Sequence, residues 1–243
     1  MSLYRIANLY VNMSPKYDHL KSYAQKYLCD DSYALEDGVD VIDINVSDEF
    51  LAERQKDNPH LSLSDCEYMW TGSVFAHKML DKNGFMLHSS AVVYNGNAYL
   101  FSADSGTGKS THTSFWQQVF GKDEAVIIND DKPVIRNIDG VFCASGTPFS
   151  GKSDLNEDIT APVKAVCFIY RSEVNEIRKI EPSEALHLIL EQTVRPKAAD
   201  GALKLLDVLD MFLRKVQVYS LGVTYSPDSA VFAYNNLSRA DNP

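Results

Sequence analysis

A run of small and polar residues, Ala103-Asp104-Ser105-Gly106-Thr107-Gly108-Lys109-Ser110-Thr111, has the spacing of a phosphate-binding loop. Glycines at 106 and 108 let backbone N–H groups wrap an anion, and the N-terminus of a following helix adds partial positive charge. Lys109 can reach the β- and γ-phosphates of a nucleotide, and the Ser110 hydroxyl can bind Mg²⁺. Ala103 replaces the first glycine of the G-x-x-x-x-G-K-[ST] pattern, and it is small enough to keep the loop.

Two adjacent carboxylates, Asp130 and Asp131, directly follow an apolar run over 125–129. Side chains of neighbours on an extended chain point in opposite directions, so the two aspartates can do different work. One can ligate Mg²⁺ while the other accepts the proton of an incoming hydroxyl. Which aspartate is the base stays open; Ser110 and Asp131 are the candidate metal ligands.

Four further side chains are candidates for contact with phosphate or substrate. His88 lies on the strand that leads toward the phosphate loop, where a single histidine is commonly structural. Lys152 ends a loop over 146–152 that contains Gly, Thr, Pro, Ser and a second Gly; it can close over the phosphates, hold the acceptor or stay solvated. Arg136 and Arg195 are candidate anion contacts, with a surface position or an ion pair as the alternative.

A strand-rich middle third must position these residues. Asn95-Gly96 supplies the two positive φ angles of a type I′ turn, so 87–94 and 97–103 are predicted to form a hairpin that ends at the phosphate loop. Asp139-Gly140 marks a second hairpin in the same way. A helix is predicted over 109–120, and the other predicted strands cover 125–129, 133–138, 141–144 and 164–170.

The outer thirds are predicted to be α+β at the start and helical at the end. Strands are expected over 4–11 and 39–46, with a helix after Ser14-Pro15 between them. Residues 48–61 are expected to be loop or irregular helix, and Ser64 with Glu67 to cap the helix that ends near residue 80. The later predicted helices cover 183–193, 199–215 and 227–236.

Composition and charge narrow the function classes. The chain has 243 residues, of which 45% are hydrophobic and 23% charged, as in an ordinary globular protein. An excess of 33 acidic over 23 basic residues gives a net charge of −10, which disfavours a nucleic-acid partner. We expect no membrane span, because no apolar run of about 18 residues exists. Without a secretion signal, we expect a cytoplasmic protein with four reduced cysteines.

Several pieces together resemble the catalytic domain of HPr kinase/phosphorylase: Leu87-His88-Ser89-Ser90-Ala91, the first hairpin, the phosphate loop and Asp130-Asp131. That family shares its nucleotide-binding core with phosphoenolpyruvate carboxykinase. The resemblance covers residues 85–170 most clearly. It implies an α+β fold with a mostly antiparallel β-core that carries the P-loop, and with helices packed by the C-terminal part. Flanking pieces are similar to an uncharacterised bacterial group of HPr-kinase-like proteins, namely residues 129–133, 146–152 and 192–196.

The resemblance also implies roles for individual residues. Asp130 and Asp131 would supply the general base and a metal contact, and His88 would lie near the transferring phosphate. The nucleotide phosphates and the metal would be bound by Gly106, Gly108, Lys109, Ser110 and Thr111. Two family features are missing: an acidic residue where this chain has Thr111, and a Gly- and Asn-containing loop that grips HPr. These departures argue against HPr as the acceptor more than they argue against phosphoryl transfer itself.

The residues and the resemblance predict a Mg²⁺-dependent kinase. It would move a phosphoryl group from ATP, or another nucleoside triphosphate, to a hydroxyl of a protein, a peptide or a small molecule. The alternatives are a nucleotide-sensing module without transfer activity, and a carboxykinase-like enzyme on a small phospho-acid, for which the chain is short.

Two regions are expected: a small α+β region over 1–80, integrated with the core, and a catalytic domain over 81–243. The N-terminal region could bind the acceptor, cover the sheet edge or build an oligomer. A homo-oligomer is expected only by analogy with the family.

Overall fold

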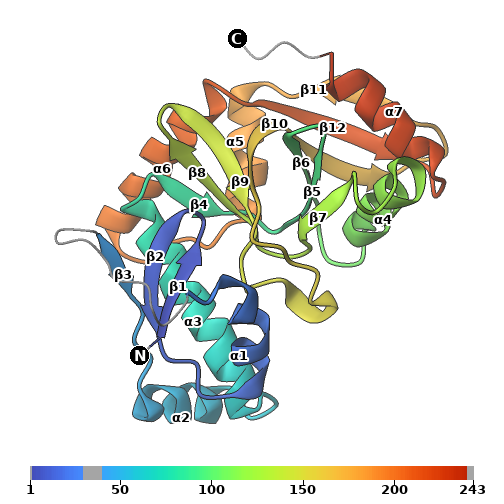
Figure 1. Cartoon of the computed structure of the whole chain (residues 1–243). Helices are drawn as coiled ribbons and strands as arrows, with labels where there is room; N and C mark the ends of the chain where they lie inside the picture. The colour runs from blue at the N-terminus through green and yellow to red at the C-terminus, as the bar shows by residue number, and fades with distance from the viewer. Residues whose placement is uncertain (1, 30–39, 240–243) are drawn as a thin grey trace.

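The computed structural model describes residues 2–29 and 40–239 of the chain. Within these residues a three-stranded sheet and a nine-stranded sheet organise the fold (Figure 1). The first residue of the strand predicted over 39–46 lies outside the described part. None of the helices in the described ranges is long and apolar enough to cross a membrane.

The N-terminal elements form a small α+β region, drawn in blue to cyan in Figure 1. They are β1 (Ser2–Ile6), β2 (Leu9–Met13), α1 (Asp18–Ala24), the 3-10 helix η1 (Gln25–Tyr27), β3 (Val41–Asp43), α2 (Asp48–Asp57) and α3 (Leu63–Leu80). β1 and β2 form an antiparallel hairpin, and β3 pairs in parallel with β2. The helices and the sheet share one apolar core that includes Ile6, Val11, Leu20, Tyr27 and Phe75.

Two sequence predictions for this region are wrong in detail. The strand predicted over 4–11 is broken by a tight turn at Ala7 and Asn8, whose φ angles are 53° and 58°. This turn contains no glycine, so its sequence carries only a weak turn signal. The segment predicted to be loop or irregular is the regular helix α2. Ser47 caps it, accepting a hydrogen bond on its hydroxyl from the N–H of Phe50 at 3.2 Å.

The capping box of α3 is formed by Ser62 and Asp65, not by Ser64 and Glu67 as the sequence predicts. The Ser62 hydroxyl accepts from the N–H of Asp65 at 3.0 Å, and the Asp65 carboxylate accepts from the N–H of Ser62 at 3.1 Å. Glu67 is buried and accepts from two backbone N–H groups just before α1, at 2.7 and 3.0 Å. Glu67 therefore joins α3 to α1, and the helix begins earlier than predicted.

The main sheet is mixed and mostly antiparallel. Its strands are β4 (Gly84–Met86), β5 (Ser89–Tyr94), β6 (Asn97–Ser102), β7 (Val126–Asn129), β8 (Val134–Ile138), β9 (Val141–Ser145), β10 (Thr160–Arg171), β11 (Glu176–Lys179) and β12 (Gln217–Val223). They follow the order β4-β8-β9-β10-β6-β5-β7, with β12 beside β10 and β11 beside β12. In the described sheet β10 pairs in parallel with β6 and β12, and the other six pairings are antiparallel. This confirms the expected α+β class with a mostly antiparallel core.

Both predicted hairpins are present. Asn95 and Gly96 have φ angles of 49° and 73° between β5 and β6, and Asp139 and Gly140 have 50° and 90° between β8 and β9. These are the positive angles of type I′ turns. Two strands of the C-terminal half, β11 and β12, were not predicted, and β10 begins four residues before the strand expected over 164–170.

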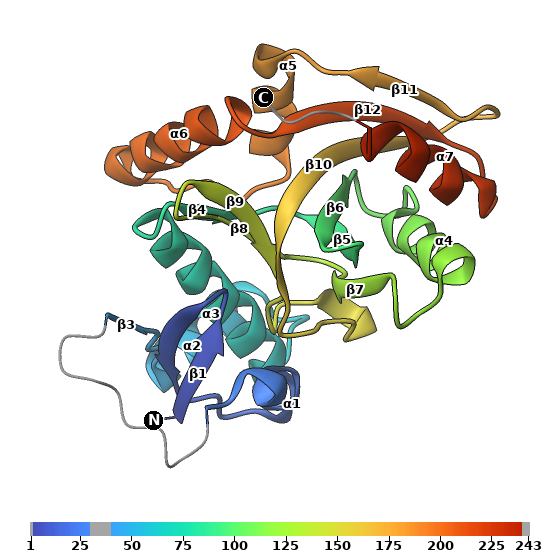
Figure 2. The same ribbon diagram turned by 45° about the horizontal axis from the view of Figure 1, so that its top comes forward.

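Helices cover both faces of the main sheet (Figure 2). They are α4 (Lys109–Phe120), α5 (Pro182–Glu191), α6 (Ala199–Leu213) and α7 (Asp228–Leu237). Alternate residues of β6 serve the two faces, as the two-residue period of a strand requires. Tyr99 and Phe101 pack with α4 and α7, whereas Ala98 and Leu100 belong to the core beneath α5 and α6.

Candidate active site

The strand order brings the candidate residues to one edge of the main sheet. β5 lies between β6 and β7 and is antiparallel to both, so β6 and β7 run in the same direction. Their carboxyl ends therefore meet at one edge, together with the start of β5. The phosphate loop follows β6, the two aspartates follow β7, and His88 precedes β5. Three separate stretches of sequence thus converge on one place.

The phosphate loop has the conformation that its glycines allow. Gly106 and Gly108 have φ angles of 80° and 124°, which other residues rarely adopt. A Cβ at either position would meet nothing within 4 Å, so backbone conformation rather than packing requires glycine here. Gly108 is also the N-cap of α4, and it has no side chain to bond the first N–H groups of that helix. These groups are placed to bind an anion.

Lys109 is buried within the loop. Its ammonium donates to the carbonyl oxygens of Ala103 at 2.8 Å and of Asp104 at 3.3 Å. Burial lowers the pKa of Lys109, while the nearby charges of Asp131 and Asp130 act to raise it.

Asp130 turns toward the helix that follows the phosphate loop. Its Oδ1 accepts a hydrogen bond from the hydroxyl of Ser90 at 2.6 Å. The Ser90 hydroxyl lies 2.7 Å from that of Thr113, which in turn donates to the carbonyl of Ser110 at 3.2 Å. Ser90 and Thr113 are fully buried, and Asp130 is nearly so. The carboxylate is therefore fixed relative to the first turn of α4.

Asp131 turns the other way. Its Oδ1 lies 3.4 Å from Nε2 of His88, and its Oδ2 accepts from the ammonium of Lys132 at 2.6 Å. The turn that presents it is held by the fully buried Asn129, whose Oδ1 accepts from the backbone N–H groups of Asp131 and Lys132 at 2.9 and 2.7 Å. The Asn129 amide group donates to the carbonyl and the hydroxyl of Thr147 at 2.9 and 3.1 Å.

His88 is connected to the phosphate loop through Gln192. The Gln192 side-chain oxygen lies 2.9 Å from Nδ1 of His88, and its Nε2 donates to Asp104 at 3.0 Å. Burial and then the positive charge of Lys109 lower the pKa of His88, against the opposing effects of Gln192 and Asp131. The charges of Lys109 and Asp131 therefore both act on the protonation of His88.

The three candidate cations differ in position. Lys152 lies in the 3-10 helix η2 (Gly151–Ser153), whose first residue packs on Asp131, so it is near the site. Arg195 is exposed and follows Val194, which lines a cavity with His88. Arg136 is not at the site: its guanidinium donates to the carbonyl of Ala7 in the N-terminal hairpin at 2.8 Å.

Arg171 at the end of β10 is a contact that the sequence prediction missed. Its guanidinium donates to the carbonyl oxygens of Thr107 at 3.1 Å and Gly106 at 2.6 Å. Asn129 and Gln192 are two further site residues that the sequence did not reveal. Each acts through partners far away in the sequence or through backbone groups, so residue type and spacing alone did not reveal it.

Several cavities border these residues. One of about 450 Å³ lies between the phosphate loop, Phe115, Arg171 and Tyr225. The rings of Phe115 and Tyr225 have their centroids 5.6 Å apart, and Tyr225 is 89% exposed. A smaller cavity, of about 250 Å³, is lined by His88, Asp131, Lys132, Glu191, Gln192 and their neighbours. A further cavity of about 400 Å³ shares Arg171 with the first and Gln192 with the second.

The donor set fits a hard cation that binds phosphate oxygens. Hydroxyl and carboxylate oxygens of Ser110, Asp130 and Asp131 are the kind of ligand that Mg²⁺ prefers, and Mg²⁺ usually takes only one or two from the protein. Across the described ranges, no three His, Cys, Asp or Glu side chains gather as an all-protein metal cage would require. The hydroxyl and the two carboxylates are thus the residues on which a metal hypothesis rests.

Comparison with known proteins gives one kind of match. No protein-family model matches the chain, and no curated protein matches it in sequence. Among solved structures it is similar to the Hpr(Ser) kinase/phosphatase from Coxiella burnetii, with 10% sequence identity and a TM-score of 0.37. The match covers 64% of this chain and 99% of that one.

Proposed function

We propose that this protein is a Mg²⁺-dependent kinase that transfers the γ-phosphoryl group of ATP, or of another nucleoside triphosphate, to a hydroxyl group. One observation carries the proposal. Lys109 of the phosphate loop and the Asp131–His88 pair lie at the same sheet edge, and cavities border both the loop and the Asp131 carboxylate. Phosphoryl transfer needs a nucleotide site and an acceptor site that meet at one point.

The nucleotide would bind on the side of the larger cavity. Backbone N–H groups of the loop and of the first turn of α4 would hold its phosphates, with Lys109 between them. Arg171 would keep the loop in shape through its two carbonyl contacts. Phe115 and Tyr225 offer aromatic faces on which a base can stack. Bound ATP supplies the transferable group, and Mg²⁺ offsets its negative charge.

The two aspartates divide the remaining work in this proposal. Asp130 is fixed to α4 through Ser90 and Thr113, so it would hold the metal together with Ser110. Asp131 lines the smaller cavity, where it would accept the proton of the incoming hydroxyl. This moves the metal role from Asp131, the first candidate, to Asp130.

The experiment uses γ-labelled ATP, Mg²⁺ and an extract of the source organism separated by size. The full-length chain is compared with its Lys109→Ala variant. We expect label to move from ATP to a protein or a small molecule with the natural chain, and to stay in ATP with the variant. Binding of ATP without any Lys109-dependent label would contradict the kinase and support the nucleotide-sensing alternative.

A further inference from the structure

Residues 146–159, here called the bridging loop, connect β9 to β10 and lie beside Asp130 and Asp131. Figures 1 and 2 show this yellow segment between the N-terminal helices and β7. Its backbone pairs with the strand that carries the aspartates: the N–H of Asp130 donates to the carbonyl of Leu155 at 3.1 Å, and the N–H of Glu157 donates to that of Ile128 at 3.0 Å. These backbone hydrogen bonds therefore fix the loop beside the two aspartates.

Within the bridging loop, Gly151 lies close beside Asp131. Its φ angle is 71°, and a Cβ built there would lie 3.0 Å from Cβ and 3.3 Å from Cγ of Asp131. The position of the Gly151 backbone therefore sets how much room the aspartate side chain has. A shift of this backbone would change that room.

The N-terminal region holds Gly151 through one side chain, Tyr68 of α3. The N–H of Gly151 donates to the Tyr68 hydroxyl at 2.8 Å. This contact joins two residues that are 83 positions apart in the chain. Burial raises the pKa of Tyr68, which keeps the hydroxyl neutral.

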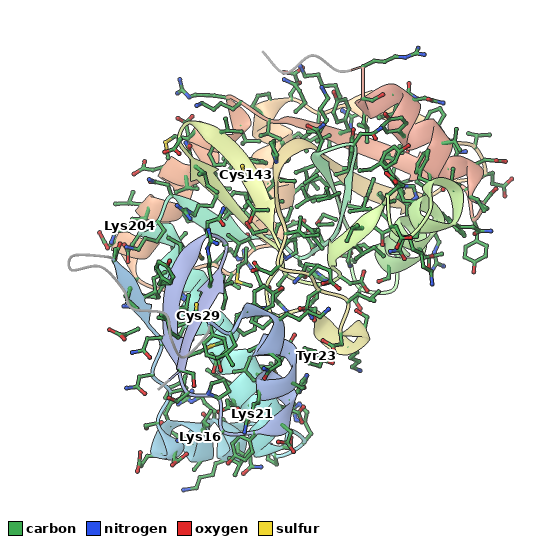
Figure 3. The ribbon with its side chains drawn as sticks, viewed as in Figure 1. Lys16, Lys21, Tyr23, Cys29, Cys143 and Lys204 are labelled. Atoms are coloured by element: carbon green, nitrogen blue, oxygen red, sulfur yellow. The ribbon has the colours of Figure 1, made fainter. Side chains whose placement is uncertain are left out.

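The Tyr68 ring is itself tightly held. The His19 ring stacks on it with centroids 4.3 Å apart and planes 5° apart, and the Phe149 ring of the bridging loop lies 5.9 Å away. The Tyr23 ring completes the cluster, also at 5.9 Å from Tyr68. Figure 3 shows Tyr23 on the side of α1 that faces the bridging loop. The hydroxyl of Tyr68 is therefore presented to Gly151 in one orientation.

A second contact fixes the far end of the bridging loop to the same region. The ammonium of Lys26 donates to the carbonyl of Asn156 at 2.6 Å and to the carboxylate of Glu157 at 2.7 Å. With Tyr68 at one end and Lys26 at the other, the N-terminal region holds the loop at two points.

We propose that Tyr68 is a positioning residue for the transfer reaction. Through Gly151, it fixes the carboxylate of Asp131 beside the smaller cavity, and so makes the N-terminal region part of the catalytic apparatus. This inference rests on the proposed function. It assigns residues 1–80 a role other than covering a sheet edge or building an oligomer.

The test is Tyr68→Phe, with Tyr23→Phe as the matched control. The first variant keeps the ring and removes the acceptor of the Gly151 N–H. The second removes the Tyr23 hydroxyl from the same cluster. Within the described residues, this hydroxyl makes no hydrogen bond to the bridging loop. We expect Tyr68→Phe to lower kcat about tenfold, because a small displacement of a reacting group is costly, while the Kd for ATP stays unchanged. We expect Tyr23→Phe to match the natural chain in both quantities.

Transfer is followed with γ-labelled ATP and the size-separated extract fraction that accepts label. Hydrogen exchange of the Gly151 amide is measured on the same proteins. Faster exchange together with a lower kcat supports the proposal. Faster exchange with an unchanged kcat overturns the role of Tyr68 and leaves the proposed kinase function standing. Unchanged exchange also overturns that role, because the hydrogen bond between Tyr68 and Gly151 would then be absent. A loss of ATP affinity equal to the loss of kcat would also overturn it.

A natural chain that transfers no label contradicts the proposed function instead, while amide exchange still reports on the contact between Tyr68 and Gly151. Should Tyr68→Phe fail to fold, Gly151→Ala gives a second route. Its Cβ would press on Asp131 at a strained backbone angle, so we expect it to reduce transfer while ATP binding is kept. Full transfer by a folded Gly151→Ala chain would overturn the proposal.

Discussion

Asp130 and Asp131 are neighbours in the chain, yet their carboxylates lie in different surroundings. Asp130 bonds to a buried hydroxyl that leads to α4, and Asp131 faces His88, Lys132 and a cavity. We therefore expect the two Asn variants to differ. Asp130→Asn should weaken Mg²⁺-dependent ATP binding by about tenfold. Asp131→Asn should bind ATP normally and lose a factor of about 10² or more in kcat. Calorimetric titration with ATP at fixed Mg²⁺, alongside label transfer, measures both effects. The opposite pattern would exchange the two roles.

His112 offers a test of stability at the same scale. It is a buried residue of α4; its Nε2 accepts from the indole of Trp116 at 3.2 Å, and its Nδ1 lies 3.2 Å from the hydroxyl of Ser229. Burial lowers its pKa from 6.5 to about 3. Between pH 6.5 and pH 3 the histidine is protonated in the unfolded chain but stays neutral in the folded one. The free energy of unfolding therefore falls as the pH drops from 6.5 toward 3. The slope from this group approaches about 1.4 kcal/mol per pH unit.

Urea unfolding of the natural chain and of His112→Gln at pH 7, 6 and 5 measures this contribution. We expect the variant to lose less stability than the natural chain between pH 6 and pH 5, whatever its stability at pH 7. An identical pH dependence in both proteins would show that His112 is not buried in its neutral form.

The local motifs of the site could be predicted from the sequence, but the residues that hold them in place through long-range contacts could not. The phosphate loop and the aspartate pair follow from composition and order along the chain. Arg171 and Gln192 reach loop residues 64 and 88 positions away, and only the sheet topology makes those contacts. The long-range contact of Arg136 was equally hidden in the sequence: its guanidinium donates to the carbonyl of Ala7 in the N-terminal hairpin, away from the other candidates.

At the scale of elements, glycine-containing turns predicted the hairpins, since a two-residue turn fixes the pairing of its own strands. Tertiary contacts decided the rest. β12 pairs with β10, which lies nearly fifty residues earlier, and the alternation in its short sequence carried too little signal to predict it. The carboxylate of Glu67 accepts hydrogen bonds from backbone N–H groups just before α1 and not from the N-terminus of its own helix. The capping box of α3 is therefore formed by Ser62 and Asp65.

The capping box gives a prediction at this scale. Ser62→Ala removes the acceptor for the N–H of Asp65 and should lower the free energy of unfolding by about 1 kcal/mol. Ser64→Ala, the change at the originally predicted cap, should alter it by less than about 0.5 kcal/mol. Denaturant unfolding of both variants distinguishes the two positions. A larger loss for Ser64→Ala would contradict the observed start of α3.

At the scale of the whole molecule, two regions meet at the candidate site. The apolar core of the N-terminal region is completed by Met86, Val134 and Phe149 from the later part of the chain. Helix α3 ends at Leu80, next to the boundary expected between residues 80 and 81, which stays a prediction. The bridging loop lies where the regions meet, and its contacts with Tyr68 and Asp131 connect the packing of the N-terminal region to the proposed chemistry.

In the proposed reaction, ATP and a hydroxyl acceptor meet at this sheet edge. The decisive experiment compares the ADP formed with the labelled acceptor formed from γ-labelled ATP, in the natural chain and in Lys109→Ala. We expect one labelled acceptor for each ADP with the natural chain and neither product with the variant. ADP and free phosphate without labelled acceptor, or tight ATP binding without ADP, would contradict it.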